Sequence, residues 1–142
     1  MKKIALLIAI CLSFVLNVNA QSKIIYSNPM THCYITAFVV NDSVMYQVSE
    51  TSDRKVWRFT DRTETQVLGL FDAETILKIF ESANTLFENK ELNKTIQIDD
   101  VILTYKRVFG VKCVNFKHSL IGIDFNINQQ TAKDIIDIFS EK

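Results

Sequence analysis

Residues 73–89 read AETILKIFESANTLFEN, and the fold prediction depends on the change of period in this stretch. Its apolar residues recur at the three- and four-residue spacing of one helix face, at Ile76, Leu77, Phe80, Ala83 and Phe87. Asp72 stands directly before the stretch and is a residue type that caps helix N-termini. The stretch therefore predicts an amphipathic helix over residues 73–89.

The sequence before this helix has the period of β-strands. Residues 33–40, CYITAFVV, are β-branched and aromatic, and Val44, Tyr46 and Val48 alternate with other residues. Asn41-Asp42 lies between these two runs and predicts a hairpin turn, because Asn and Asp tolerate left-handed backbone. The other elements expected here are turns at residues 51–53 and 61–62 and strands over residues 55–60 and 64–71.

A second run of strands follows the helix. Residues 95–109 predict two strands or one long bent strand, Gly110 predicts a turn, and residues 111–118 predict another strand. Apolar residues alternate with polar residues and glycine over residues 121–128, as in a half-buried strand. A final helix is expected near residues 132–139, where Thr131 and Asp134 resemble a capping box.

The two halves of the chain have similar patterns. ILKIF at residues 76–80 aligns with IIDIF at residues 135–139, which fits either an internal duplication or a pattern common to amphipathic helices. Strand runs segregated from helices predict the α+β class. The expected architecture is an antiparallel β-sheet built from two meanders, each followed by an amphipathic helix, with both helices on one face of the sheet.

The first twenty residues have the pattern of a secretory signal peptide. Met1-Lys2-Lys3 is positive and residues 4–16 are almost entirely apolar. Val18 and Ala20 fit the −3 and −1 positions of a cleavage site before Gln21. The apolar run is too short to span a bilayer, which needs about 20 residues. We expect residues 1–20 to be cleaved, residues 21–142 to form a single α+β domain, and the protein to be exported to a periplasmic or extracellular location.

Composition excludes several classes of partner. Lys2 and Lys3 leave with the leader, which takes the 16 basic residues to 14 against 16 acidic residues. A slightly acidic chain lacks the basic footprint of a nucleic-acid-binding protein. No second apolar run approaches 18 residues, so no membrane span is expected in the mature chain.

Cys33 and Cys113 are the only cysteines after the leader, and an exported chain meets an oxidising compartment. They are a candidate disulfide if their strands are neighbours, and otherwise two buried free thiols. His32 adjoins Cys33, and His118 follows Cys113 by five residues. This is not the short-clip spacing of zinc ligands, so no metal site is predicted.

Basic and aromatic residues are mixed around residues 54–62. Arg54, Arg58 and Arg62 flank Trp57, a combination that can bind a carboxylate, a sugar or a single-stranded nucleic acid. The alternative is a strand with a solvated charged face. A second basic strip has the same two interpretations and comprises Lys106, Arg107, Lys112 and Lys117.

The sequence carries none of the common catalytic or phosphate-binding motifs and predicts no cofactor. The leading hypothesis is a small exported non-catalytic domain that binds a protein or ligand partner. One alternative is an enzyme that uses Cys33 or Cys113 with His32 or His118. The other is a structural subunit of a surface assembly, which exposed Met45 or Leu68 would favour.

Overall fold

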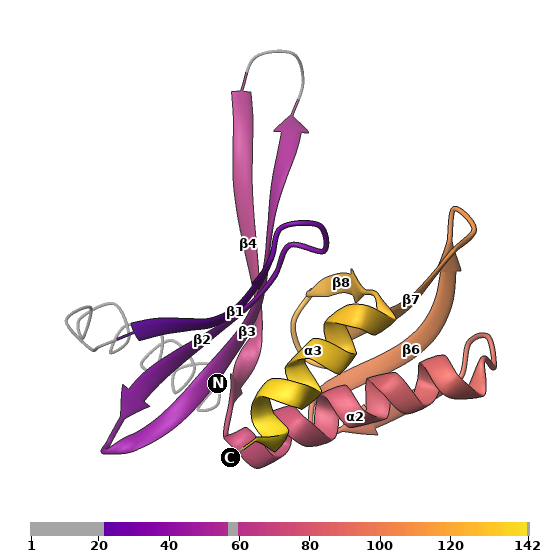
Figure 1. Cartoon of the computed structure of the whole chain (residues 1–142). Helices are drawn as coiled ribbons and strands as arrows, with labels where there is room; N and C mark the ends of the chain where they lie inside the picture. The colour runs from indigo at the N-terminus through magenta and orange to yellow at the C-terminus, as the bar shows by residue number, and fades with distance from the viewer. Residues whose placement is uncertain (1–21, 57–59, 142) are drawn as a thin grey trace.

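The computed structural model describes residues 22–56 and 60–141, and the side chains of those residues outside 52–64. The elements, in chain order, are β1 (Ser22–Asn28), β2 (Cys33–Val40), β3 (Ser43–Val56), β4 (Thr60–Phe71), α2 (Ala73–Asn89), β5 (Thr95–Ile98), β6 (Val101–Val108), β7 (Val111–His118), β8 (Asp124–Ile127) and α3 (Gln129–Ser140) (Figure 1). The α+β class is confirmed. The predicted leader, residues 1–20, lies outside the described residues.

The strands form two sheets, so the expected single sheet is wrong. The N-terminal sheet has the order β1-β2-β3-β4 and the C-terminal sheet the order β5-β6-β7-β8, both antiparallel. Helix α2 has 17 residues and stands between β4 and β5. At 1.5 Å per residue it carries the chain about 25 Å from the first sheet before β5 begins. The two helices pack on each other, and α2 also packs on β6 and β7, so the helices do not lie together on one face of a single sheet as expected.

Helix α2 forms where the sequence predicted it. The Asp72 carboxylate accepts a hydrogen bond of 2.7 Å from the backbone N–H of Thr75 at the start of the helix. Lys90 ends the helix in the left-handed conformation, and its N–H donates to the Leu86 carbonyl at 3.2 Å. Both ends of the helix therefore have partners for backbone groups that would otherwise be unsatisfied.

Helix α3 begins earlier than expected, and the Thr131 capping box is wrong. Asn128 is the N-cap, with its side-chain oxygen accepting from the Thr131 N–H at 2.8 Å. Thr131 lies inside the first turn and is fully buried. An Asn one turn upstream is the stronger cap because its carbonyl reaches the free N–H groups with the same geometry as Asp72.

The turns expected at residues 51–53 and 61–62 are also wrong, because both segments lie within strands. β3 continues to Val56 and pairs along its length with β4, from Tyr46↔Phe71 to Val56↔Thr60. No Gly or Pro interrupts residues 43–66, so polar composition alone does not break the strands. The strand expected over residues 121–128 is reduced to β8. By contrast, the Asn41-Asp42 hairpin is confirmed, with φ angles of 49° and 63°.

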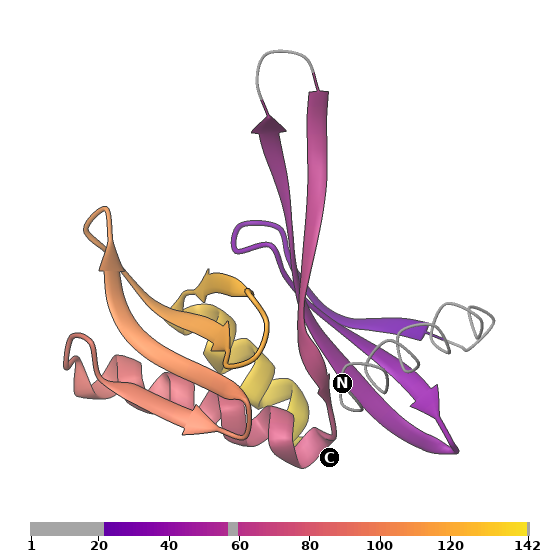
Figure 2. The same ribbon diagram turned by 180° about the vertical axis from the view of Figure 1, so that it is seen from behind.

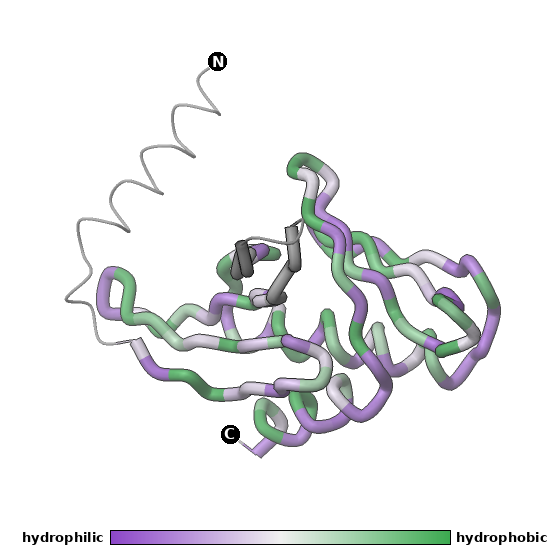
Figure 3. The backbone as a smooth tube through the Cα atoms, turned by 90° about the horizontal axis from the view of Figure 1, so that it is seen from above, coloured by the Kyte–Doolittle hydropathy of each residue, from purple (hydrophilic) through white to green (hydrophobic). Residues whose placement is uncertain are grey.

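One hydrophobic core joins both sheets and both helices. Ring pairs mark its contacts: Phe80 of α2 meets Phe116 of β7 at 5.5 Å between centroids, and Phe87 meets Tyr105 of β6 at 5.8 Å. Phe139 of α3 meets Tyr46 of β3 at 4.8 Å. Hydrophobic and hydrophilic residues alternate along much of both sheets (Figure 3), as expected where one face packs on a core and the other faces water.

We expect Phe80→Ala to lower the free energy of unfolding by about 3–5 kcal/mol, because Phe80 is fully buried and its removal leaves a cavity between α2 and β7. Urea denaturation followed by circular dichroism measures this loss. Leu92→Ala is the control, since Leu92 is 52% exposed and its truncation changes stability by no more than about 0.5 kcal/mol. Equal effects of the two substitutions would contradict the assigned core.

Asp72→Ala is expected to lower stability at pH 7 by about 1 kcal/mol through loss of the N-cap. The hydroxyl and the N–H of Thr75 lower the pKa of the Asp72 carboxyl from 3.8, so the capping contribution is present above pH 3.8 and is lost as pH falls through the folded-state pKa. Denaturation at pH 7 and at pH 3 measures the difference in free energy of unfolding between the unmodified protein and Asp72→Ala. We expect this difference to be smaller at pH 3. Asp72→Asn keeps an acceptor and loses much less stability at pH 7.

Candidate functional site

A two-stranded ribbon projects from the N-terminal sheet. β2 pairs with β3 only as far as Cys33↔Glu50, and residues 52–56 and 60–64 pair with each other beyond that point. We call these residues the β3–β4 ribbon. Figure 2 shows it rising away from both sheets and from the helices. A two-stranded hairpin without further neighbours is only marginally stable in water.

The base of the ribbon is well anchored. The N–H of Thr51 donates to the carbonyl of His32 in the β1–β2 turn at 3.0 Å. The hydroxyls of Thr51 and Thr65 lie 3.1 Å apart across the two strands. The ribbon therefore extends from a fixed point on the N-terminal sheet.

The structure brings two of the four predicted binding residues together. Arg54 and Arg62 occupy directly opposed positions in the β3–β4 register, so they share one face of the ribbon. Trp57 and Arg58 lie outside the described residues. This pairing was not predicted, because a turn was expected at Asp61-Arg62.

Of the two outcomes considered for Cys33 and Cys113, the candidate disulfide is not formed, and both cysteines are free and buried. Cys33 lies on β2 and Cys113 on β7, in different sheets, so their strands are not the neighbours that a bridge would need. Burial, together with the charge of Glu50, raises the pKa of the Cys33 thiol to about 12. Burial also raises the pKa of Cys113, although Lys106 opposes the shift.

The two histidines have different surroundings from the cysteines near them in the sequence. His32 is exposed in the β1–β2 turn with a φ of 55°, and Cys33 beside it is fully buried. His118 ends β7, where its Nδ1 accepts from the N–H of Leu120 at 3.1 Å. A catalytic cysteine needs a lowered pKa, and both thiols have raised values.

A polar cluster on β7 and β8 was not predicted. Asn115 is buried, with 2% of its surface exposed. Its Nδ2 donates to Asp124 Oδ1 and, at 2.9 Å, to Asn126 Oδ1. Its Oδ1 has no protein partner. The only signal in the sequence is an amide between Val114 and Phe116, which alternation places on the face opposite the core.

This cluster also joins the two sheets. The N–H of Asp124 donates to the side-chain oxygen of Gln66 on β4 at 3.0 Å. Asp124 pairs with Lys117 at 3.7 Å across β7 and β8. These bonds account for the cluster as a contact between the edge strands β4 and β8, which is a structural role.

Comparison with protein-family models, curated proteins and solved structures finds no match for this chain. In residues 22–56 and 60–141, no group of three or more His, Cys, Asp and Glu side chains is placed to hold a metal ion. The same residues contain no helix that is long and apolar enough to cross a membrane.

We expect both thiols to resist a water-soluble thiol reagent at pH 8 in the native protein and to react fully after unfolding in urea. Burial and raised pKa values keep them protonated and covered. Absorbance of the released chromophore measures the reaction. A bridged species in non-reducing mass spectrometry, or a melting temperature that falls on adding reductant, would contradict the free-thiol assignment.

Proposed function

We propose that this protein is an exported, non-catalytic binding domain and that the β3–β4 ribbon carries its docking site. The observation that carries the proposal is the opposition of Arg54 and Arg62 on a ribbon that extends beyond the rest of its sheet. Export is proposed from the leader pattern of residues 1–20.

Residues 52–64 carry four Lys and Arg residues and three Asp and Glu residues, and the opposition of Arg54 and Arg62 is what favours an acidic partner. Two arginines at opposed positions of the register would together attract a carboxylate or phosphate group. Arginine also binds such groups through two parallel hydrogen bonds. Arg58 and Trp57, close in sequence, are proposed to contribute to binding. A protein with an exposed acidic segment is the partner that fits best.

The two alternative functions have less support. A Cys/His enzyme would need a reactive thiolate, whereas burial raises the pKa of both cysteines. A structural subunit was expected to expose Leu68, which is fully buried, and Met45 is only partly exposed.

We also propose that the chain contains an internal duplication. Two similarities between the halves support it. Each middle hairpin has a two-residue loop with positive φ angles, Asn41-Asp42 in one sheet and Phe109-Gly110 in the other. Each helix is capped by the oxygen of Asp72 or Asn128, which accepts from a threonine three residues later.

The binding proposal is tested by capturing partners from the cell envelope of the source organism with residues 21–142. We expect Arg54→Glu with Arg62→Glu to abolish capture of an acidic protein that the unmodified domain retains. A control double substitution, Lys78→Glu with Lys133→Glu, changes the charge equally on exposed helix positions and is expected to leave capture intact.

A second variant removes the ribbon without disturbing its base. Residues 52–64 are replaced by Asn-Gly, which links the opposed Thr51 and Thr65 in a favourable two-residue turn. We expect this protein to keep its circular dichroism spectrum and to lose the partner. Undiminished capture by the folded, shortened protein would contradict the ribbon as the docking site.

A further inference from the structure

The loop between β6 and β7 presents an aromatic residue in an unfavourable conformation. Val108 and Val111 form the last pair, which leaves Phe109 and Gly110 as a two-residue turn. Their φ angles are 49° and 81°, both positive as a type I′ turn requires. Such a turn favours Asn followed by Gly, and a bulky residue in the left-handed region is strained. Phe109 is nonetheless fully exposed, at 102%, so its ring does not contribute to the core.

Phe109 is the end of a larger hydrophobic tip. Val108 and Val111 beside it are 37% and 65% exposed. We call Val108, Phe109, Gly110 and Val111 the hydrophobic tip. An exposed apolar group at the end of a hairpin costs the free protein in water unless something covers it.

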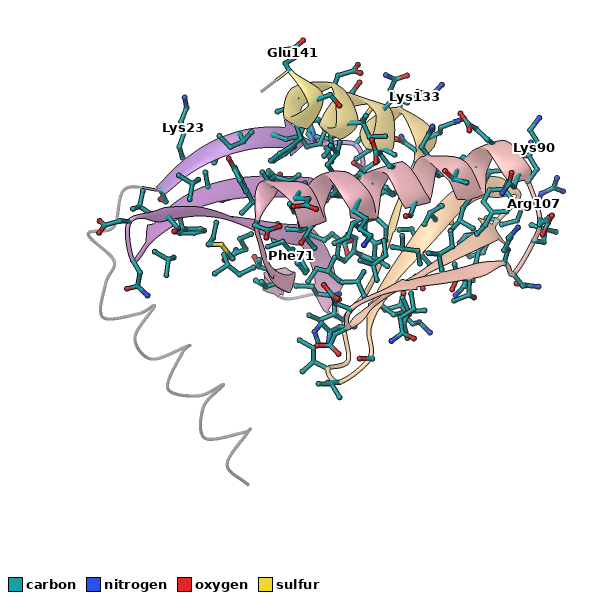
Figure 4. The ribbon with its side chains drawn as sticks, turned by 90° about the horizontal axis from the view of Figure 1, so that it is seen from below. Lys23, Phe71, Lys90, Arg107, Lys133 and Glu141 are labelled. Carbon is teal, nitrogen blue, oxygen red and sulfur yellow. The ribbon has the colours of Figure 1, made fainter. Side chains whose placement is uncertain are left out.

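Basic residues lie next to the hydrophobic tip on both β6 and β7. Arg107 and Lys112 are opposed in the register one step behind the two valines, and both are exposed. Lys106 follows on β6. Residues 101–118 contain four Lys and Arg residues and no Asp or Glu. Arg107 and Lys90 point outward at the same end of the molecule (Figure 4), while the nearby Glu91 is paired with Lys94 at 3.2 Å.

We propose that the hydrophobic tip inserts into the surface of a lipid bilayer with anionic headgroups. The order along the hairpin axis, apolar residues first and cations one step behind, matches the order of depth in a bilayer surface, where acyl chains lie beneath the charged headgroups. Phe109 and the valines enter the apolar layer, while Arg107 and Lys112 contact the headgroup phosphates. The contact is peripheral and reversible.

A protein partner fits this tip less well. A stable protein interface buries about 800 Å² on each side, whereas the end of one hairpin offers four residues. A protein interface also places its polar residues as a rim around an apolar centre. Here the polar residues lie behind the apolar ones along the axis. The inference concerns a surface different from the ribbon and does not depend on the proposed function.

The test is co-sedimentation of residues 21–142 with vesicles of phosphatidylcholine alone and of phosphatidylcholine with phosphatidylglycerol. We expect binding to the anionic vesicles only, weakened as salt rises from about 0.1 M to about 0.5 M because salt screens the cations. Phe109→Asn is expected to reduce the partition coefficient about tenfold or more, the loss that removal of one buried Phe implies.

Phe109→Asn also separates binding from folding. Asn-Gly is the preferred type I′ pair, so this variant keeps or raises the melting temperature while it loses vesicle binding. Arg107→Glu with Lys112→Glu is expected to abolish binding to anionic vesicles. The matched control, Lys23→Glu with Lys78→Glu, makes the same charge change at exposed positions outside the hairpin and is expected to bind normally.

Three results would overturn the proposal: no sedimentation of the unmodified domain with anionic vesicles, equal binding by Phe109→Asn, or equal loss of binding in the Lys23/Lys78 control. Loss of vesicle binding by the variant that lacks residues 52–64 would instead assign the membrane contact to the ribbon. Since the protein-capture experiment uses the ribbon variants and no vesicles, failure of one proposal leaves the other measurable.

Discussion

The packing of helix α2 is the interaction on which the rest of the structure depends. Its apolar face contacts β6 and β7 of one sheet, reaches β3 of the other, and packs along α3. Phe80 and Phe87 place aromatic rings against the C-terminal sheet. The edge strands add a smaller contact between the two sheets, in which the side chain of Gln66 on β4 meets the backbone of Asp124 on β8.

Elements that depend on residues close together in the sequence were predicted correctly. The period of residues 73–89 and the cap at Asp72 fixed α2 to the residue, and the Asn41-Asp42 turn was equally clear. The division of the strands into two sheets could not be predicted from local sequence, because it depends on where β5 begins after α2. Asn128 was missed as a cap because the apolar pattern of α3 becomes visible only from Ala132.

The candidate sites were predictable in composition and not in arrangement. Arg54 and Arg62 stood out as basic residues among aromatics, but their opposition depends on a register that continues through polar residues without a breaker. Cys33 and Cys113 are separated because their strands belong to different sheets, which no spacing reveals. Phe109 was included in a predicted strand, and only its positive φ and full exposure distinguish it.

Every strand in both sheets pairs with its neighbour in sequence. Such pairing keeps most contacts local, so hairpin formation closes only short loops and costs little chain entropy. The chain-entropy cost of the fold is therefore concentrated in the contacts that join distant parts of the chain, such as Phe139 with Tyr46. Those contacts bring α3 back to the N-terminal sheet and close the longest loops.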